Sequence, residues 1–199
     1  MQNPTPRSGA YWGSLDPLEH AVQIYASDTL FLDSLEGYIG AALRNDESVI
    51  VIASAAHLHE VEIRLRRGWI DLDRARWEDR YIALLAPEVL ERISVDGAVN
   101  EGRMQAVVGE LLARARGPRG KRKVRAFGEM VADLWAAHRS EEALILEGMW
   151  ARLQVHEKFP LFCAYPRSLF KLDSQLAINA ICAAHTHVVP GFLVPASSQ

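Results

Sequence analysis

The sequence predicts an α/β fold in three layers, with a mainly parallel five-stranded sheet flanked by helices. Two observations carry this prediction. Residues 49–52 form a continuous run of β-branched apolar side chains, which is typical of a strand covered on both faces. Along the whole chain, short apolar runs alternate with amphipathic segments of helical length, which indicates βαβ units and parallel strands.

The first elements follow from local signals. A short apolar run predicts a strand at residues 21–25. Ser27 or Asp28 then suits the N-cap of a helix, because short polar side chains accept hydrogen bonds from the first free backbone N–H groups. The second strand is expected at residues 48–53, and the helix after it ends near Gly68, a residue favoured just beyond a helix C-terminus.

The remaining elements continue this alternation. Pro87 suits the first turn of a helix, and Asn100 suits the N-cap of a longer one. The Gly-Pro-Arg-Gly sequence at 117–120 ends that longer helix. The expected elements are strands at 81–85, 123–127 and 159–164, and helices at 88–93, after Asn100, at 130–135, after Ser140 and after Ser174.

Composition indicates one globular domain. The chain has 199 residues, of which 49% are hydrophobic and 24% charged, enough to form a substantial core. We expect a flexible N-terminal tail at 1–17, a single domain at 18–190 and a C-terminal tail at 191–199. The formal net charge of -3 argues against direct binding of nucleic acid or of an anionic membrane.

The expected location is the cytoplasm. No apolar run reaches the roughly 20 residues of a membrane span, and the first 13 residues lack the apolar segment of a secretory signal. The two cysteines, Cys163 and Cys182, lie in apolar surroundings, so we expect buried, reduced thiols rather than a disulfide.

The turn after the first strand argues against nucleotide binding. A phosphate-binding loop needs glycines for close backbone approach and a lysine for the phosphates. The turn from Tyr25 to Thr29 has neither, and Asp28 would repel a phosphate. We therefore expect no nucleotide and no other cofactor.

Glu129 is the most informative polar residue, because it follows an apolar strand at the sheet edge where parallel α/β folds bind ligands. It could contact a ligand, act as a base, or tie the fold together by binding Arg125 or backbone N–H groups. No nucleophile or second acid lies near it in sequence, so we expect no enzyme activity.

Two other patterns are weaker. Cys182 and His185 would share a helix face, but two ligands do not complete a zinc site, and two histidines two residues apart, as in His57 and His59, point to different faces. We therefore expect no metal. The basic stretch at 116–125 is interpreted as a solvated loop, with contact to an anion or acidic partner as the alternative.

Several segments together resemble the MEDS family, the sensory domain named for methanogens, methylotrophs and the dichloromethane-response regulator DcmR. The resemblance spans roughly residues 18–190. Its most specific segments are Phe-Gly-Glu-Met at 127–130 and Cys-Ala-Tyr-Pro at 163–166. The family often carries Asp where this chain has Leu85 and Asn where it has Ala151, so two polar pocket residues are replaced.

The resemblance implies a RecA/KaiC-like fold without a phosphate-binding loop, and a sensory role proposed for small hydrocarbon derivatives. Our hypothesis is a non-catalytic domain that binds a small, largely apolar organic ligand. It would signal through a separate histidine kinase, transcription regulator or other partner. The alternative is a ligand-free module for protein interaction or self-association, including a homodimer. The side chains expected to contact the ligand are Tyr25, Ser27, Glu129, Glu147, Trp150 and Tyr165.

Overall fold

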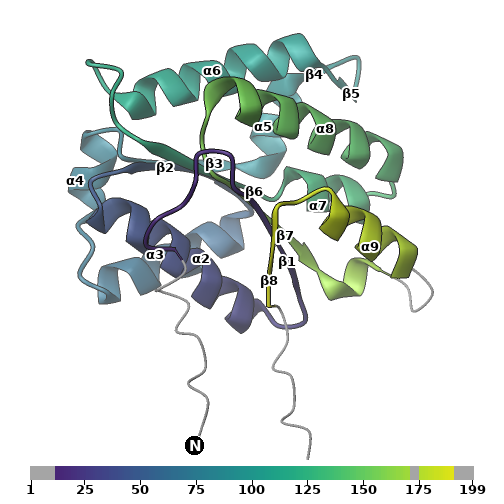
Figure 1. Ribbon diagram of the computed structural model, residues 1–199, viewed down its shortest axis with the longest axis horizontal. Coiled ribbons are helices and arrows are strands. Elements are labelled where there is room, and N and C mark those ends of the chain that lie inside the picture. Colours follow the sequence, from purple (N-terminus) through teal and green to yellow (C-terminus); the bar gives the residue numbers. More distant parts are fainter. Residues whose placement is uncertain (1–11, 171–174, 191–199) are drawn as a thin grey trace, which may run out of the picture.

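The computed structural model describes residues 12–170 and 175–190, in which strands and helices alternate as the sequence predicts (Figure 1). The predicted C-terminal tail at 191–199 lies outside the described residues. The strands are β1 His20–Tyr25, β2 Ser48–Ala53, β3 Tyr81–Leu85, β4 Ser94–Val95, β5 Ala98–Val99, β6 Val124–Gly128, β7 Leu161–Pro166 and β8 His187–Val189. The helices are α2 Asp28–Arg44, α3 Ala55–Arg67, α4 Leu72–Trp77, α5 Ala86–Ile93, α6 Glu101–Arg116, α7 Met130–Ala136, α8 Ser140–Glu157, α9 Gln175–Ala183 and the 3-10 turn η1 Arg167–Leu169.

The main sheet is parallel throughout and has the order β3-β2-β6-β7-β1-β8. The predicted α/β class and its five strands are confirmed, and β8 adds a sixth at the edge beside β1. Cys182 and His185 were expected to share a helix face, which was wrong for His185, because α9 ends at Ala183 and the chain then turns into β8. A strand of three residues is too short to show a periodic signal.

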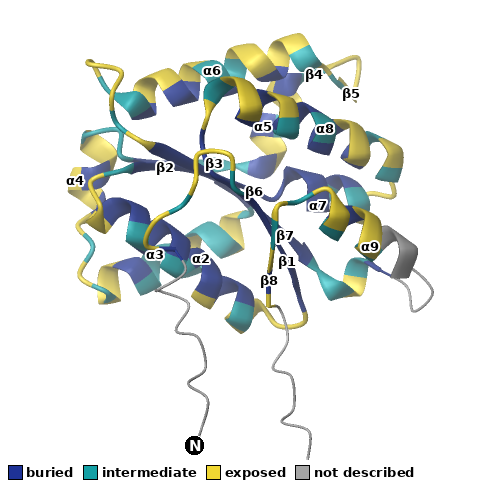
Figure 2. Ribbon diagram, viewed as in Figure 1, coloured by how far each residue is buried: buried dark blue, intermediate teal, exposed yellow. Residues whose placement is uncertain are grey.

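Helices cover both faces of the sheet (Figure 1). Helices α2, α3 and α4 pack on one face, and α5 to α9 pack on the other. Side chains alternate between these two cores along each strand, so Val49 and Val51 enter one core while Ile50 and Ile52 enter the other. The strands are buried throughout their central part (Figure 2), as the apolar run at 49–52 predicts. In the described part of the chain, no helix has the length and apolar character needed to cross a membrane.

Two neighbouring strands send the chain to opposite faces of this sheet. After β2 the chain enters α3 on one face, and after β6 it enters α7 on the other. The connecting turns therefore diverge at the carboxyl ends of β2 and β6. This arrangement is a topological switch point, where open α/β sheets form a crevice for ligands.

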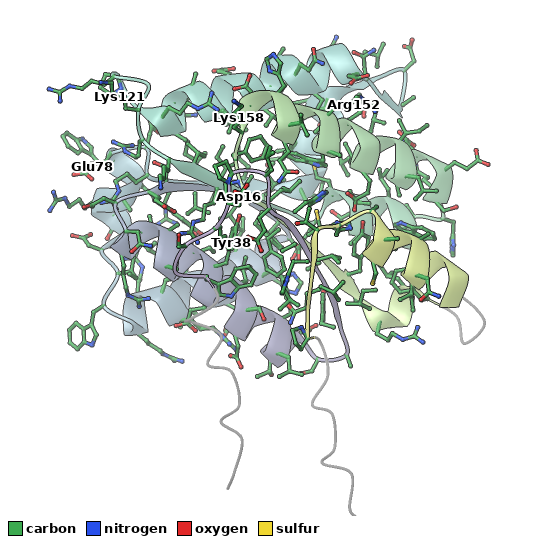
Figure 3. All side chains as sticks on the ribbon, in the orientation of Figure 1. Asp16, Tyr38, Glu78, Lys121, Arg152 and Lys158 are labelled. Carbon is green, nitrogen blue, oxygen red and sulfur yellow. The ribbon has the colours of Figure 1, made fainter. Side chains whose placement is uncertain are left out.

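Residues near the N-terminus are fixed to the opposite, amino-terminal edge of the sheet. Trp12 lies within the segment 1–17 that the sequence predicts to be a flexible tail, yet its side chain is only 1% exposed. Its ring packs against Tyr38 and Phe162, and its carbonyl oxygen accepts a hydrogen bond of 2.6 Å from buried Arg125. The hydroxyl of Tyr38, a residue labelled in Figure 3, lies 3.0 Å from the carbonyl oxygens of both residue 126 and residue 160 at the same edge and shares its one proton between them.

The basic stretch at 116–125 is only partly a solvated loop. Arg116 pairs with Glu157, Arg122 donates to backbone carbonyls, and Arg125 is buried and pairs with Glu47. Lys121 is exposed and points away from the molecule (Figure 3). Three of the arginines therefore hold the fold together, which leaves few charges for a partner.

Candidate functional site

Four ionisable side chains lie together at the carboxyl-terminal edge of the sheet, and we call Tyr25, His57, Glu129 and Asp133 the edge group. Tyr25 ends β1, His57 lies in the first turn of α3, and Glu129 and Asp133 flank the start of α7. Tyr25 and Glu129 are buried, whereas His57 is partly exposed. The group therefore lies at the switch point between β2 and β6.

Glu129 connects the two strands at this point. Its Oε2 accepts a hydrogen bond of 2.7 Å from the backbone N–H of Ser54, and its Oε1 is bonded to Nδ1 of His57. Its own backbone N–H donates to the Ile52 carbonyl at 2.9 Å. Arg125 and backbone N–H groups were the two structural partners expected for Glu129. The structure shows a backbone N–H contact, whereas Arg125 pairs with Glu47.

An aromatic wall stands beside the Glu129–His57 pair. The rings of Tyr25 and Phe31 are stacked with centroids 4.6 Å apart, and the Phe31 ring meets the His57 imidazole edge-on at 4.9 Å. Aromatic faces with a few fixed polar groups are typical of small-molecule sites. The edge group thus offers both apolar contact and charge.

The close charges shift one another's pKa. The hydrogen bond to Glu129 raises the pKa of His57, which favours the charged imidazolium. Burial, and then the Glu129 charge, raise the pKa of Asp133 to about 6. Burial, and then Glu129, also raise the pKa of the Tyr25 hydroxyl. The edge group is thus sensitive to the charge of Glu129.

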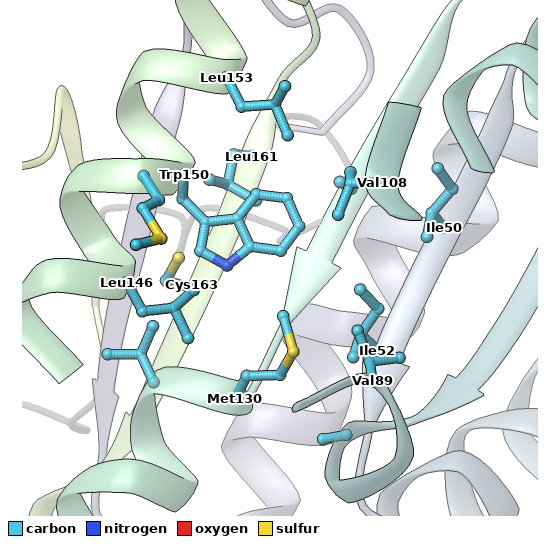
Figure 4. Packing of buried hydrophobic residues seen from close by; sticks show 14 of the residues in the cluster. Ile50, Ile52, Val89, Val108, Met130, Leu146, Trp150, Leu153, Leu161 and Cys163 are labelled. Carbon is cyan, nitrogen blue, oxygen red and sulfur yellow. The ribbon is translucent and has the colours of Figure 1, made fainter. Parts of the chain in front are cut away.

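A second polar group is enclosed between the sheet and the helices α8 and α9, and we call His20, Glu147, Cys163 and His185 the buried cluster. His20 begins β1, Cys163 lies in β7, Glu147 lies on α8, and His185 follows α9. Neighbouring apolar side chains of this core include Leu146 and Trp150 (Figure 4), which lie beside Cys163.

Short distances join the members of this cluster. Nε2 of His20 lies 3.4 Å from Sγ of Cys163 and 3.9 Å from Oε2 of Glu147. Nε2 of His185 lies 3.8 Å from Oε1 of Glu147. The Tyr165 hydroxyl donates a hydrogen bond to Oε1 of Glu147.

Burial dominates the electrostatics of the cluster. It lowers the pKa of His20 to about 3, with His185 acting in the same direction, so the imidazole is neutral. It raises the pKa of Glu147, which His185 and the Tyr165 hydrogen bond oppose. It also raises the pKa of the Cys163 thiol.

A comparison with protein families gives a match that spans both groups of residues. The profile of MEDS, the methanogen/methylotroph, DcmR sensory domain, matches residues 19–186. The chain belongs to the MEDS family. The match covers most of the chain and includes both the edge group and the buried cluster. Comparisons with curated proteins and with solved structures gave no match.

In this MEDS domain, the six predicted contact residues do not form one cluster. Tyr25 and Glu129 belong to the edge group, whereas Glu147 belongs to the buried cluster on the other face of β1 and β7, where Tyr165 donates a hydrogen bond to it. Trp150 is 1% exposed and lies beside Gly128, in the core between the sheet and the helices α5 to α9. The Ser27 residue is an exposed N-cap without a side-chain capping bond.

The sequence reasoning missed several residues of both groups. It considered His57 only with His59 as a metal motif, although His57 lies three residues after the Ser54 cap and so faces the strand ends. It paired His185 with Cys182, whereas this structure places His185 beside His20, Glu147 and Cys163. Only the adjacency of β1 and β7 reveals this grouping, since 143 residues separate His20 from Cys163.

Two surface depressions lie elsewhere, at the amino-terminal edge of the sheet. One, of about 70 Å³, is lined by Glu47, Lys123 and Pro160, each of which directly precedes a strand. The other, of about 230 Å³, lies beside Trp69 and Arg80. Neither contains a predicted contact residue.

Proposed function

We propose that this MEDS domain is a non-catalytic sensor that binds a small, largely apolar organic ligand at the edge group. The observation that carries the proposal is the position of the Glu129–His57 pair at the switch point between β2 and β6. Membership of a sensory-domain family supports the regulatory role. We further propose a cytoplasmic location, which suits the two free cysteines.

The chemistry of the edge group favours a small molecule with one polar end. The Tyr25, Phe31 and His57 rings offer an apolar wall, while His57 and Asp133 offer groups that donate or accept hydrogen bonds. A triphosphate is disfavoured, because Asp28, Glu129 and Asp133 place several carboxylates near this edge. The turn after β1, without glycine or lysine, agrees with that conclusion.

The same residues offer a route for the signal. Glu129 precedes α7 on one face, while Ser54 and His57 begin α3 on the other. A ligand that takes the place of His57 on Glu129 would loosen the contact between these two helix starts. A surface helix would then shift, and a separate signalling protein would read the change.

A binding screen tests this proposal. Short-chain alcohols, amines and halogenated alkanes are added to the purified chain, and stabilisation is followed by thermal shift and native mass spectrometry. We expect one class to raise the Tm of the unaltered chain but not of Tyr25→Ala or Glu129→Gln. The exposed Glu88→Gln is the matched carboxylate control and should respond normally. Equal stabilisation of all four proteins would contradict binding at the edge group.

A ligand-free interaction module is the second candidate, and two exposed tryptophans favour it. Trp69, which precedes the short helix α4, is 95% exposed, and Trp77, the last residue of α4, is 85% exposed. Large exposed aromatic side chains are common in protein interfaces. Sedimentation of the chain and of the Trp69→Ser/Trp77→Ser double variant tests self-association. If this module is the function, the unaltered chain forms dimers that the variant does not form.

A further inference from the structure

We propose that the buried cluster is a metal site, in which His20, Glu147, Cys163 and His185 bind one Zn²⁺ ion. Each residue offers one ligand atom, and all four atoms lie within 4.8 Å of one another. The proposal is independent of a ligand at the edge group, because the two groups lie on different faces of β1 and share no residue.

Two buried polar atoms of the cluster have no hydrogen-bond partner. They are Oε2 of Glu147 and Nε2 of His185, and the His185 side chain is fully buried. An unpartnered buried polar group costs about 1–3 kcal/mol. The separations of 3.8 and 3.9 Å between the Glu147 oxygens and the two imidazoles are too long for hydrogen bonds. A proton on Glu147 therefore does not complete the cluster, whereas an ion in its centre would.

The spacing fits a tetrahedral zinc ion. Zinc bonds of about 2.0–2.3 Å place neighbouring nitrogen and oxygen ligands about 3.4 Å apart, and nitrogen and sulfur about 3.6 Å apart. The separations here are 3.4 Å between Nε2 of His20 and Sγ of Cys163 and 3.9 Å between Nε2 of His20 and Oε2 of Glu147, and all four ligand atoms lie within 4.8 Å of one another. Side-chain rotations that move each ligand atom by about half an ångström would bring it to bonding distance from a central zinc ion.

Two contacts outside the cluster already orient the ligands. Nδ1 of His185 donates its proton to the Ile181 carbonyl at 2.7 Å, which leaves the lone pair of Nε2 facing the cluster. The Tyr165 hydroxyl occupies Oε1 of Glu147, which leaves Oε2 as the free oxygen. Metal-bound histidines and carboxylates are typically held by such secondary hydrogen bonds.

The charge of the cluster also fits a divalent ion. With the thiol proton displaced by the metal, Cys163 and Glu147 supply two negative charges and the imidazoles supply none. A Zn²⁺ ion makes the complex neutral, so its burial costs far less than that of an unpaired charge. Two nitrogens, a thiolate and a carboxylate form a donor set that suits zinc.

Metal analysis of the full chain tests the site. The untagged protein is expressed with added zinc, desalted and measured by inductively coupled plasma mass spectrometry. We expect stoichiometric zinc in the unaltered chain, and its loss in Cys163→Ser and in His185→Gln. The matched controls Cys182→Ser and His59→Gln, which lie outside the cluster, should keep it. Glu129→Gln should keep it too, whatever its effect at the edge group.

Cobalt substitution tests for a thiolate ligand in the unaltered chain, so this test does not depend on the folding of a variant. Co²⁺ bound by the unaltered chain should show a thiolate-to-cobalt charge-transfer band, and Cys182→Ser should retain it. Tyr165→Phe should weaken metal affinity by about 10- to 100-fold, because Glu147 loses its orienting bond. The proposal is overturned if the unaltered chain holds no zinc, if iron or copper is the stoichiometric metal, or if the cobalt spectrum lacks the thiolate band.

Discussion

The edge group and the buried cluster contain similar residue types but differ in how well their polar atoms are satisfied. At the edge, both oxygens of Glu129 are bonded, one by His57 and one by the Ser54 backbone. In the cluster, one oxygen of Glu147 and one nitrogen of His185 have no hydrogen-bond partner.

This difference separates two kinds of site. A satisfied carboxylate explains its own burial, so Glu129 already has a structural role, and any ligand must compete with His57. An unsatisfied pair at greater depth has no such explanation and requires another atom to complete it. At the edge, neighbouring charges shift the pKa of each group. In the core, a charged group needs an opposite charge beside it.

Removal of metal from the buried cluster should give the largest effect of the comparison. A ligand present at 1,000 times its Kd stabilises the folded state by about 4 kcal/mol. For a chain of this size, the Tm should therefore be about 10 °C lower in a buffer that contains a chelator than in a buffer that contains zinc. Circular dichroism melts in zinc and in chelator measure the change. Cys163→Ser should melt alike in both, and an equal Tm for the unaltered chain in both would argue against a bound ion.

Loss of the edge carboxylate should rank second. Glu129→Ala leaves the Ser54 N–H and the His57 ring without an acceptor and disconnects the ends of β2 and β6. We expect a loss of about 2–3 kcal/mol in the free energy of unfolding, measured by urea titration. Glu88→Ala, on an exposed part of α5, should change it by less than about 0.5 kcal/mol. A similar small change for Glu129→Ala would mean that the contact does not stabilise the fold.

The dependence of stability on pH through the His57–Glu129 pair should be a smaller effect than the loss of Glu129. It can be followed at His57. Because Glu129 raises the pKa of His57 above 6.5, the pair stabilises the folded state fully below pH 6.5 and loses this contribution as pH rises through the raised pKa. Imidazole NMR should report a His57 titration above pH 6.5. Glu129→Gln should bring the His57 value back toward 6.5, and an unchanged value would exclude Glu129 as the cause.

The smallest effect should come from Asp133. Its raised pKa, about 6, means that the folded state holds a proton between about pH 4 and 6, and the associated stability is lost above that range. Asp133→Asn should therefore match the unaltered chain near pH 4 and exceed it slightly above pH 6. Since Asp133 is only partly buried, we expect less than about 1 kcal/mol in urea titrations at the two pH values. A variant that is less stable than the unaltered chain at high pH would contradict an unfavourable effect of burial and of Glu129 on the charged Asp133 carboxylate.

The fold could be predicted because its signals are local. The β-branched run at 49–52, the Asn100 cap and the turn at 117–120 each report a structure within a few residues of themselves. The hairpin of β4 and β5 and the strand β8 were not predicted, because two or three residues carry no periodic pattern.

The sites could be predicted only in part, because they depend on strand order. Glu129 stands out in the sequence as a carboxylate at a strand end, but its partner His57 comes from a different strand-to-helix turn. His20 and Cys163 meet only because β7 pairs with β1. Trp150 was expected to contact a ligand, because helical spacing places it on the same helix face as Glu147. In the structure its side chain is buried in the core.

The position of β1 in the sheet has a consequence for how the protein is made. Among the described strands, β1 lies between β7 and β8, which follow all the other strands in sequence. Until β7 has been synthesised, β1 has neither of these partner strands, and its apolar residues remain available to chaperones or to other nascent chains. β1 can therefore join the sheet only after residues 161–166 have been synthesised, whereas β2, β3 and β6 can pair before that point.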